Sequence, residues 1–426
     1  MNEGNHDPDG RGGTELSEQQ RLDWLRLIRS DNVGPSTFRK LVNKFGGAGA
    51  ALAALPGLIA KAGGSRKIRI ADERDCEREY RALQRMGGRL IALGEASYPA
   101  LLREISTAPP LVSVLGKVDV LKRPLVAIVG SRNASAAGLS MTERLVGELA
   151  LAEYGIVSGL ARGVDRQAHM ASLLTGTVAV LAGGLDQIYP PEHAGLAEEI
   201  CRHGALLSEM PVGWQARGRD FPRRNRIVSG LSYATIVVEA ARRSGSLITA
   251  RFANEQGREV FAVPGSPLDP RAEGPNQLLS QGATICLSGG QVAEVLSPMR
   301  AEGAPGRGLN FDDSDAGEPK EEDLWDETDL FGAPETPTTM AGMEFDDAAR
   351  SGSKAIAFDG NGGEAAPDMR GLGDLLCAAP VSVDELVRLS GLSVAQVKTG
   401  LLDLELEGRL ERHGGGLVSL KAAGNR

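Results

Sequence analysis

The chain has 426 residues, a hydrophobic content of 42% and a formal net charge of −9. This length predicts two or three domains with linkers rather than a single core. No apolar run reaches the roughly 18 residues that a membrane helix requires, and the polar N-terminal stretch lacks the apolar segment of a signal peptide. The four cysteines are scattered, which argues against a disulfide framework or a zinc site. We therefore expect a cytoplasmic protein without a membrane segment, a bound metal or a cofactor.

The charge is unevenly distributed along the chain. Residues 301–369 contain 18 Asp/Glu and 4 Lys/Arg, a local charge of 4 − 18 = −14, which leaves −9 + 14 = +5 on the remaining chain. The same segment is rich in Gly, Pro, Thr and Ala, a composition that predicts an acidic disordered linker. A mildly basic body is compatible with a nucleic-acid partner.

The N-terminal part is predicted to be helical after a disordered stretch over residues 1–17. Within residues 18–71, apolar residues repeat at helix spacing, and Gly34-Pro35 separates them from a second, basic helix that starts near Thr37. This pattern resembles a helix-hairpin-helix (SAM-like) unit, whose turn presents backbone amides to a DNA phosphate. A small helical bundle with a solvated basic face is an equally good interpretation.

Residues 72–300 are predicted to form the main domain. A helix over 72–86 precedes a short strand over 89–93, and strands then alternate with helices. This alternation predicts an α/β fold of the Rossmann-like, doubly wound type with a mainly parallel sheet. Ligands of such sheets bind beyond the carboxyl ends of the strands, where the loops converge. The main strands are expected over 125–129, 156–158, 177–182, 206–208, 234–239 and 259–263.

Residues 370–421 are predicted to form a winged helix. Ser382 and Ser393 each begin a capping box, Gly391 separates the two helices, and a glycine-rich hairpin follows over 413–416. The second capped helix is more acidic than basic, which disfavours reading of the major groove. We expect this domain to contact a protein rather than a specific DNA sequence.

The turn after the first main strand organises the candidate site. Gly130, Ser131 and Arg132 lead into a helix from about Ser135, a geometry that offers backbone N–H groups and a positive dipole end to an anion. Arg132 stands where a dinucleotide fold has its second glycine. The turn is therefore expected to hold a phosphate but to bind NAD poorly.

The densest candidate segment runs from Phe221 to Ser232. Arg223, Arg224 and Arg226 flank Asn225 next to an aromatic ring, with Arg217 and Arg219 just upstream. Arginine forks hold phosphates, and a phenylalanine ring gives a base a surface on which to stack. The competing interpretation is a solvated basic helix start with Phe221 in the core.

Two further turns are candidate phosphate cradles. Gly159, Arg162 and Gly163 lie in a turn that leads into a helix. The competing interpretation is that Asp165, in the first turn of this helix, serves only as its N-terminal carboxylate. A third turn opens a helix with Ser246 as the expected cap and Thr249 in its first turn, a weak signal by itself. His169 and His193 have no nucleophile placed by a motif, so the sequence offers no convincing catalytic set.

Several ordered motifs resemble the DNA-processing protein A family (DprA, also called Smf). They include GSR at 130–132, SGLARGVDRQAH, FPRRNRIVSGLS and GPNQLLSQGA, and the resemblance covers about residues 90–290. It implies a homodimer without catalytic activity. The implied partners are single-stranded DNA, which the protein protects, and the RecA recombinase, which it loads during natural transformation. It also implies DNA contacts by Arg132, Phe221, Arg224 and Arg226, with Arg217 or Arg219 in place of the usual lysine.

Two alternatives remain open. A related Rossmann-like class of phosphoribohydrolases cleaves nucleotides with a P-G-G-x-G-T-x-x-E loop. The comparable stretch here, residues 244–251, lacks the glutamate, which counts strongly against hydrolysis. The other alternative is a DNA-binding scaffold whose winged helix recruits a further partner.

Overall fold

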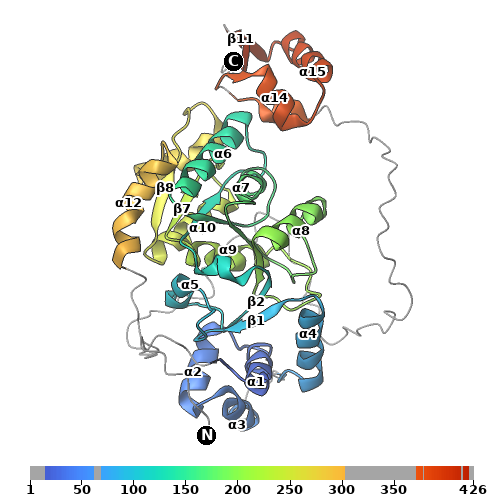
Figure 1. Cartoon of the computed structure of the whole chain (residues 1–426), viewed down its shortest axis with the longest axis vertical. Helices are drawn as coiled ribbons and strands as arrows, with labels where there is room; N and C mark the ends of the chain where they lie inside the picture. Colours follow the sequence, from blue (N-terminus) through green and yellow to red (C-terminus); the bar gives the residue numbers. More distant parts are fainter. Residues whose placement is uncertain (1–14, 62–68, 303–370, 378, 414–415, 422–426) are drawn as a thin grey trace, which may run out of the picture.

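The computed structural model describes residues 15–61, 69–302, 371–377, 379–413 and 416–421. A helical unit lies at one end of the long axis, the α/β domain in the middle and a small C-terminal domain at the other end (Figure 1). The predicted linker and the predicted N-terminal disorder up to residue 14 lie outside the described residues, apart from the start of the linker at 301–302. At residues 16 and 17 the prediction of disorder is wrong. The Leu16 N–H donates to Glu95 (3.0 Å), and Ser17 caps the first helix in a complete capping box.

The helical unit consists of α1 (Glu18–Ile28), α2 (Pro35–Phe45), α3 (Ala48–Lys61) and α4 (Glu73–Arg85). Pro35 is the first residue of α2, two residues before the expected start, because a proline at this position loses no helical hydrogen bond. The Trp24 and Phe38 rings meet edge to face in its core, with centroids 4.9 Å apart. An ion pair between Arg21 and Glu95 (2.6 Å) joins the unit to the α/β domain.

The central sheet has nine strands in the order β1-β2-β6-β5-β4-β3-β7-β8-β9. All pairs from β6 to β9 in this order are parallel, and β1 and β2 add antiparallel pairs at one edge. The predicted mainly parallel α/β sheet is therefore confirmed. The strands are β1 (Arg89–Ala92), β2 (Leu111–Gly116), β3 (Leu125–Val129), β4 (Gly155–Ser158), β5 (Thr177–Leu181), β6 (Ala205–Ser208), β7 (Ala234–Val237), β8 (Glu259–Ala262) and β9 (Thr284–Ile285).

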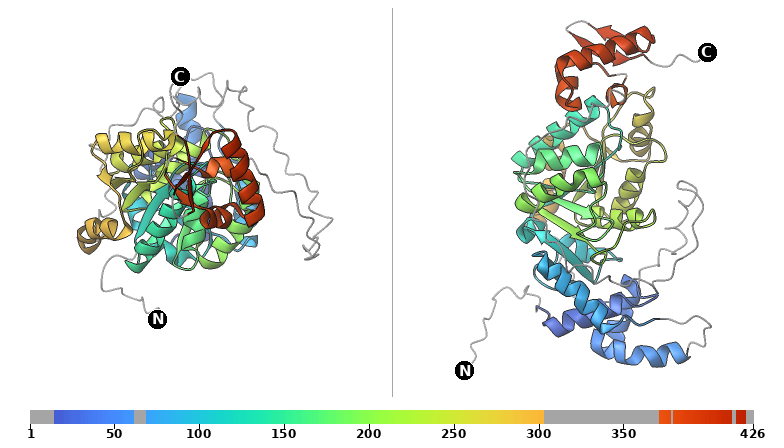
Figure 2. Two further views of the ribbon diagram at one scale, coloured as in Figure 1. Left: turned by 90° about the horizontal axis from the view of Figure 1, so that it is seen from above. Right: turned by 90° about the vertical axis from the view of Figure 1, so that its right-hand side faces the viewer.

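Helices cover both faces of this sheet (Figures 1 and 2). Alternate residues of β3 show the pattern: Ala127 and Val129 face one apolar cluster, and Val126 and Ile128 face the other. The first face is covered by α5 (Ala100–Glu104), α9 (Asp220–Gly230), α10 (Gly245–Glu255) and α11 (Glu273–Ser280), and the second by α6 (Ala136–Leu151), α7 (Val164–Ser172), α8 (Ala194–His203) and α12 (Gly289–Glu302). Within the described ranges, no helix is long and apolar enough to span a bilayer.

The described residues of the C-terminal domain form the predicted winged helix, and a third strand, β10, pairs with the predicted hairpin. Only Ser393 forms the complete capping box, whereas Ser382 accepts from the Glu385 N–H and the Glu385 carboxylate faces Arg388. The elements are α13 (Gly371–Leu375), β10 (Val381–Ser382), α14 (Val383–Ser390), α15 (Val394–Leu406), β11 (Leu410–His413) and β12 (Leu417–Leu420).

The winged helix packs against the α/β domain beside the start of α6. Ala136 of α6 belongs to the apolar core cluster of the winged helix. Arg271 donates to the carbonyl oxygens of Asp374 (2.8 Å) and Leu376 (2.7 Å). The domain is therefore docked near the carboxyl ends of the central strands.

Candidate nucleic-acid interface

The Gly130–Asn133 turn connects β3 to α6, as predicted, but the N-terminus of α6 already holds an anion from the protein. Ser135 caps the helix by accepting from the Gly138 N–H (3.0 Å). Glu239, which follows β7, accepts from the Ser135 N–H (2.9 Å) and hydroxyl (2.5 Å). Burial raises the pKa of Glu239 despite these bonds. The expectation that this helix end is free for a phosphate is therefore wrong, because a carboxylate occupies it.

Arg132 instead extends into solvent beside an aromatic pair. Its guanidinium carbon lies 5.8 Å from the centroid of the Phe221 ring, which belongs to the first turn of α9. The Phe221 ring meets the Tyr189 ring edge to face, with centroids 5.6 Å apart. Three loops, after β3, β5 and β6, thus converge at the carboxyl edge of the sheet. Sequence reasoning missed Tyr189, although an aromatic residue in a long loop after a parallel strand was a usable signal.

Two backbone N–H groups of the turn at residues 159–163 are bonded within the protein. Asp165 accepts from the N–H groups of Gly159 (3.1 Å) and Ala161 (3.3 Å). Gly163 has a positive φ of 70° and packs so tightly on the Ser131 carbonyl that a side chain has no room. The turn therefore supports the Arg132 loop and is not the predicted phosphate cradle. Arg162 is exposed and forms an ion pair with Glu192.

Arg224 and Arg226 face inward, although the resemblance implies DNA contacts for both. Each is only 6% exposed. Arg224 donates to the carbonyl oxygens of Gly159 and Val180, and burial lowers its pKa to about 10. Arg226 donates to Thr107 and forms an ion pair with Glu209 (2.5 Å). In this structure neither guanidinium is open to a phosphate, and both fix α9 to neighbouring loops.

The rest of the arginine-rich segment lies closer to the surface. Phe221 is partly exposed, an exposure between those expected from the base-stacking and the core interpretations. Asn225 donates to the Gly245 carbonyl (3.1 Å). Arg217 and Arg219 are exposed on the loop before α9. The Arg217 guanidinium lies 5.0 Å from the centroid of the Trp214 ring, a second aromatic residue that sequence reasoning missed.

The third predicted turn is closed. Ser244, and not Ser246, caps α10, because the Ser244 hydroxyl accepts from the Ser246 N–H. Ser246 and Thr249 are 9% and 2% exposed, and the two serine hydroxyls lie 2.6 Å apart. These side chains therefore contribute little accessible surface to the edge of the sheet.

The two candidate histidines, His169 and His193, are buried and lack the exposure that acid–base work requires. His169 Nδ1 lies 2.7 Å from the Thr177 hydroxyl, and burial lowers the pKa of His169 to about 3. His193 Nδ1 lies 2.9 Å from the Leu160 carbonyl oxygen. Among the described residues, no group of three His, Cys, Asp or Glu is placed to hold a metal ion.

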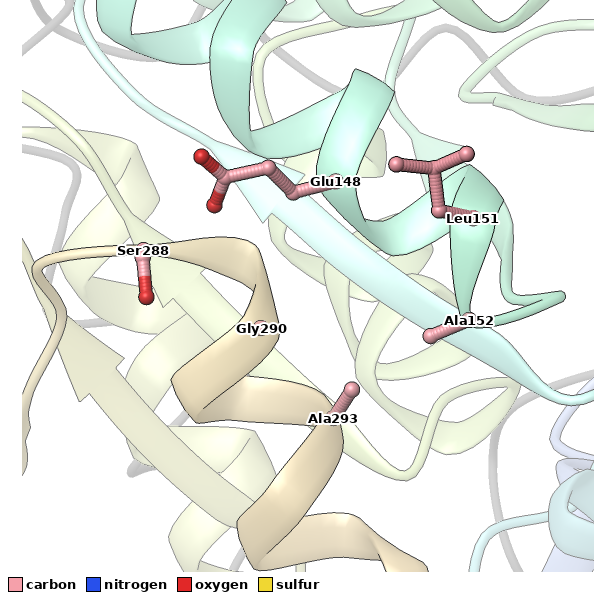
Figure 3. A pocket seen from close by; sticks show the side chains of 6 residues that line it. All are labelled: Glu148, Leu151, Ala152, Ser288, Gly290 and Ala293. Atoms are coloured by element: carbon pink, nitrogen blue, oxygen red, sulfur yellow. The ribbon is translucent and has the colours of Figure 1, made fainter.

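A surface hollow lies away from this edge, where the C-terminal end of α6 meets the start of α12 (Figure 3). Glu148 accepts from the Gly289 N–H (2.6 Å) across it, and the exposed Leu151 forms part of its wall. Glu148 lies thirteen residues after Ser135, about 20 Å along the helix axis. The hollow offers no cation and is separate from the Arg132 site.

The fold and the edge of the sheet define a class of protein. It is a Rossmann-like α/β protein with a helical N-terminal unit and a winged helix. Its turn after β3 carries Arg132, and Glu239 occupies the N-terminus of the helix that follows. Comparison with known proteins identifies the family. Three family descriptions match in order: "DprA-like N-terminal HHH domain" over residues 18–82, "DNA recombination-mediator protein A" over 89–297 and "DprA winged helix domain" over 361–416. The chain belongs to the DprA family.

Individual relatives agree with this assignment. Protein Smf of Synechocystis is 31% identical over 94% of this chain and 98% of its own length. The DNA processing protein DprA of Bacillus subtilis is 43% identical over 50% of this chain and 73% of its own length. The X-ray structure of DprA from Streptococcus pneumoniae matches 66% of this chain and 98% of its own with a TM-score of 0.56 and 35% identity.

Proposed function

We propose that this protein binds single-stranded DNA at the carboxyl edge of its sheet. The observation that carries the proposal is the Arg132–Phe221–Tyr189 cluster, in which a solvent-facing guanidinium lies beside the Phe221 ring and that ring meets the Tyr189 ring. A guanidinium attracts a backbone phosphate, and an aromatic ring stacks on any base. Stacking requires bases that are unpaired, so this combination favours a single strand over a duplex.

The proposed DNA contacts are the exposed side chains of Arg132, Arg162, Arg217 and Arg219 together with Phe221 and Asn225, over the Gly130–Ser131 turn. Arg224, Arg226, Gly159 and Gly163 hold the loops beneath these side chains, and Ser246 and Thr249 support the start of α10.

The proposal extends to recombination. Membership of the DprA family supports a cytoplasmic mediator that protects incoming single-stranded DNA and loads RecA during natural transformation. Ile285 and Leu287, at the β9 edge of the sheet, are 43% and 56% exposed, an apolar edge that supports a homodimer. No catalytic role is proposed, because His169 and His193 are buried and Glu239 is bonded to Ser135 at the start of α6.

A binding titration tests the DNA proposal. Fluorescence anisotropy should show tighter binding to a single-stranded oligonucleotide than to its duplex. Arg132→Ala should lower the salt slope by about 0.7, because one DNA phosphate is then no longer neutralised. Arg202→Ala is the matched control, an exposed arginine in the last turn of α8 at the opposite edge of the sheet. A preference for duplex, or an unchanged slope for Arg132→Ala, would overturn the proposal.

Two assays separate the wider claims. The protein should shorten the lag of RecA-dependent ATP hydrolysis on single-stranded DNA. An unchanged lag would refute the proposal of RecA loading but not the proposal of DNA binding. Release of a free base from a nucleoside monophosphate would instead favour the phosphoribohydrolase alternative.

A further inference from the structure

We infer that Tyr189 and Trp214 are two further base-stacking residues for unpaired bases and that the buried carboxylate of Asp220 positions Trp214. This inference rests on the proposed single-strand binding and deepens it. It adds two aromatic side chains from loops outside the arginine-rich segment.

Tyr189 is an exposed aromatic residue on a braced loop. The residue is 53% exposed, although the loop around it is fixed at several points. The Ser208 hydroxyl donates to the Gly183 carbonyl (2.6 Å), and the Gly184 N–H donates to the Trp214 carbonyl (2.9 Å). A large ring exposed on a fixed loop keeps apolar surface in contact with water, which is unfavourable and contributes nothing to folding. A stacked base would cover that surface.

Trp214 is held in place by its indole nitrogen. The Trp214 Nε1–H donates to Asp220 (2.9 Å), and the same carboxylate oxygen accepts from the Arg217 N–H (2.9 Å). Asp220 is 1% exposed, so these bonds offset the cost of burying its charge. The Arg217 guanidinium lies over the Trp214 ring at 5.0 Å, a cation–π contact. Ring and cation are thus presented together.

The two loops act as one support for the aromatic residues. The bond from Gly184 to Trp214 and a bond from the Gly213 N–H to Asp186 (2.8 Å) tie the Tyr189 loop to the Trp214 loop. Asp220 directly precedes Phe221 in α9, so the carboxylate that orients Trp214 adjoins the residue that contacts Tyr189. Alternating rings and guanidinium groups match a strand of alternating bases and phosphates.

The test compares two single-stranded probes of one length, about 20 nucleotides, which exceeds the site of a single module. One probe is normal oligo-dT, and the other has abasic deoxyribose at its central positions. Tyr189→Ala and Trp214→Ala should each weaken binding of the normal probe by between about 5-fold and 150-fold, the range for the removal of one stacking partner. On the abasic probe these effects should disappear. Tyr189→Phe keeps the ring and should bind like the wild type.

Asp220 is tested as a positioning residue by combining substitutions. Asp220→Ala together with Trp214→Ala should weaken binding by less than the product of the two separate factors, because Asp220 acts through Trp214. Equal effects on both probes, or independent effects of the pair, would overturn the inference and leave single-strand binding standing. Failure of the wild-type protein to bind the normal probe would instead refute the proposed function.

Discussion

Substitution of Glu239 tests the claim that the protein fills its own anion site at the start of α6. Glu239→Ala removes the acceptor of two hydrogen bonds from Ser135, at 2.9 and 2.5 Å. A bond to a charged group contributes about 1.5–3 kcal/mol, but burial of the carboxylate opposes both bonds. We expect a net loss of about 2–4 kcal/mol in the free energy of unfolding, and a lower melting temperature by roughly 4–16 °C.

The same substitution should open the helix end to an external anion. Inorganic phosphate at ten times its dissociation constant should raise the free energy of unfolding of Glu239→Ala by about 1.4 kcal/mol and so restore part of the lost melting temperature. It should leave the wild type unchanged. Calorimetry in matched phosphate and chloride buffers measures both effects. An Ala variant as stable as the wild type, or equal stabilisation of both proteins by phosphate, would refute the reasoning.

Glu239 also has a defined pH signature. Burial raises the pKa of the folded-state carboxyl above its ordinary value. The folded state therefore binds the proton more tightly than the unfolded state. As pH rises from the ordinary pKa to the raised one, the contribution of Glu239 to the free energy of unfolding falls. Glu239→Gln should flatten that part of the curve of stability against pH. An identical slope in the two proteins would contradict the assignment.

Contacts at the carboxyl edge predict three further effects. Phe221→Ala should weaken single-strand binding by about 1–3 kcal/mol at an unchanged melting temperature; a lower melting temperature with intact binding would favour the core interpretation. Arg224→Ala leaves the Asp165 carboxylate buried without its neighbouring cation and should lower stability by about 3–5 kcal/mol, measured by denaturant unfolding. A stable variant that loses only DNA binding would instead show a direct contact. Arg271→Ala removes two bonds to the winged helix and should increase hydrogen exchange in α13; unchanged exchange would show that other contacts hold the domain.

The sequence was sufficient for the fold because strand runs such as Leu125–Val129 are strongly apolar and end in clear turns. It missed β2 and β9. Strand β2 follows the Pro109-Pro110 break and pairs with β1 and with β6, which is distant in sequence. Strand β9 is two residues long. Local patterns carry little information about such elements, because their pairing is decided by tertiary packing.

Side-chain direction was harder to predict than position. Arg223, Arg224 and Arg226 are adjacent in sequence, yet Arg224 and Arg226 turn inward to carbonyl oxygens and Glu209. Composition marks such a run as basic but does not show which partners the folded chain brings to it. Glu239 shows the same limit, since its bond to Ser135 joins residues 104 positions apart.

Three acidic residues occupy backbone donors at the carboxyl edge of the sheet. Glu239 takes the N–H of Ser135, Asp165 takes those of Gly159 and Ala161, and Asp220 takes that of Arg217. The N–H groups that these carboxylates occupy are backbone donors of the kind that holds the phosphates of a bound nucleotide in other Rossmann-like proteins. With these donors already satisfied, the attraction for an anion passes to exposed arginine side chains. Such side chains lie along a surface rather than around one phosphate, and therefore suit an extended polyanion better than a small nucleotide.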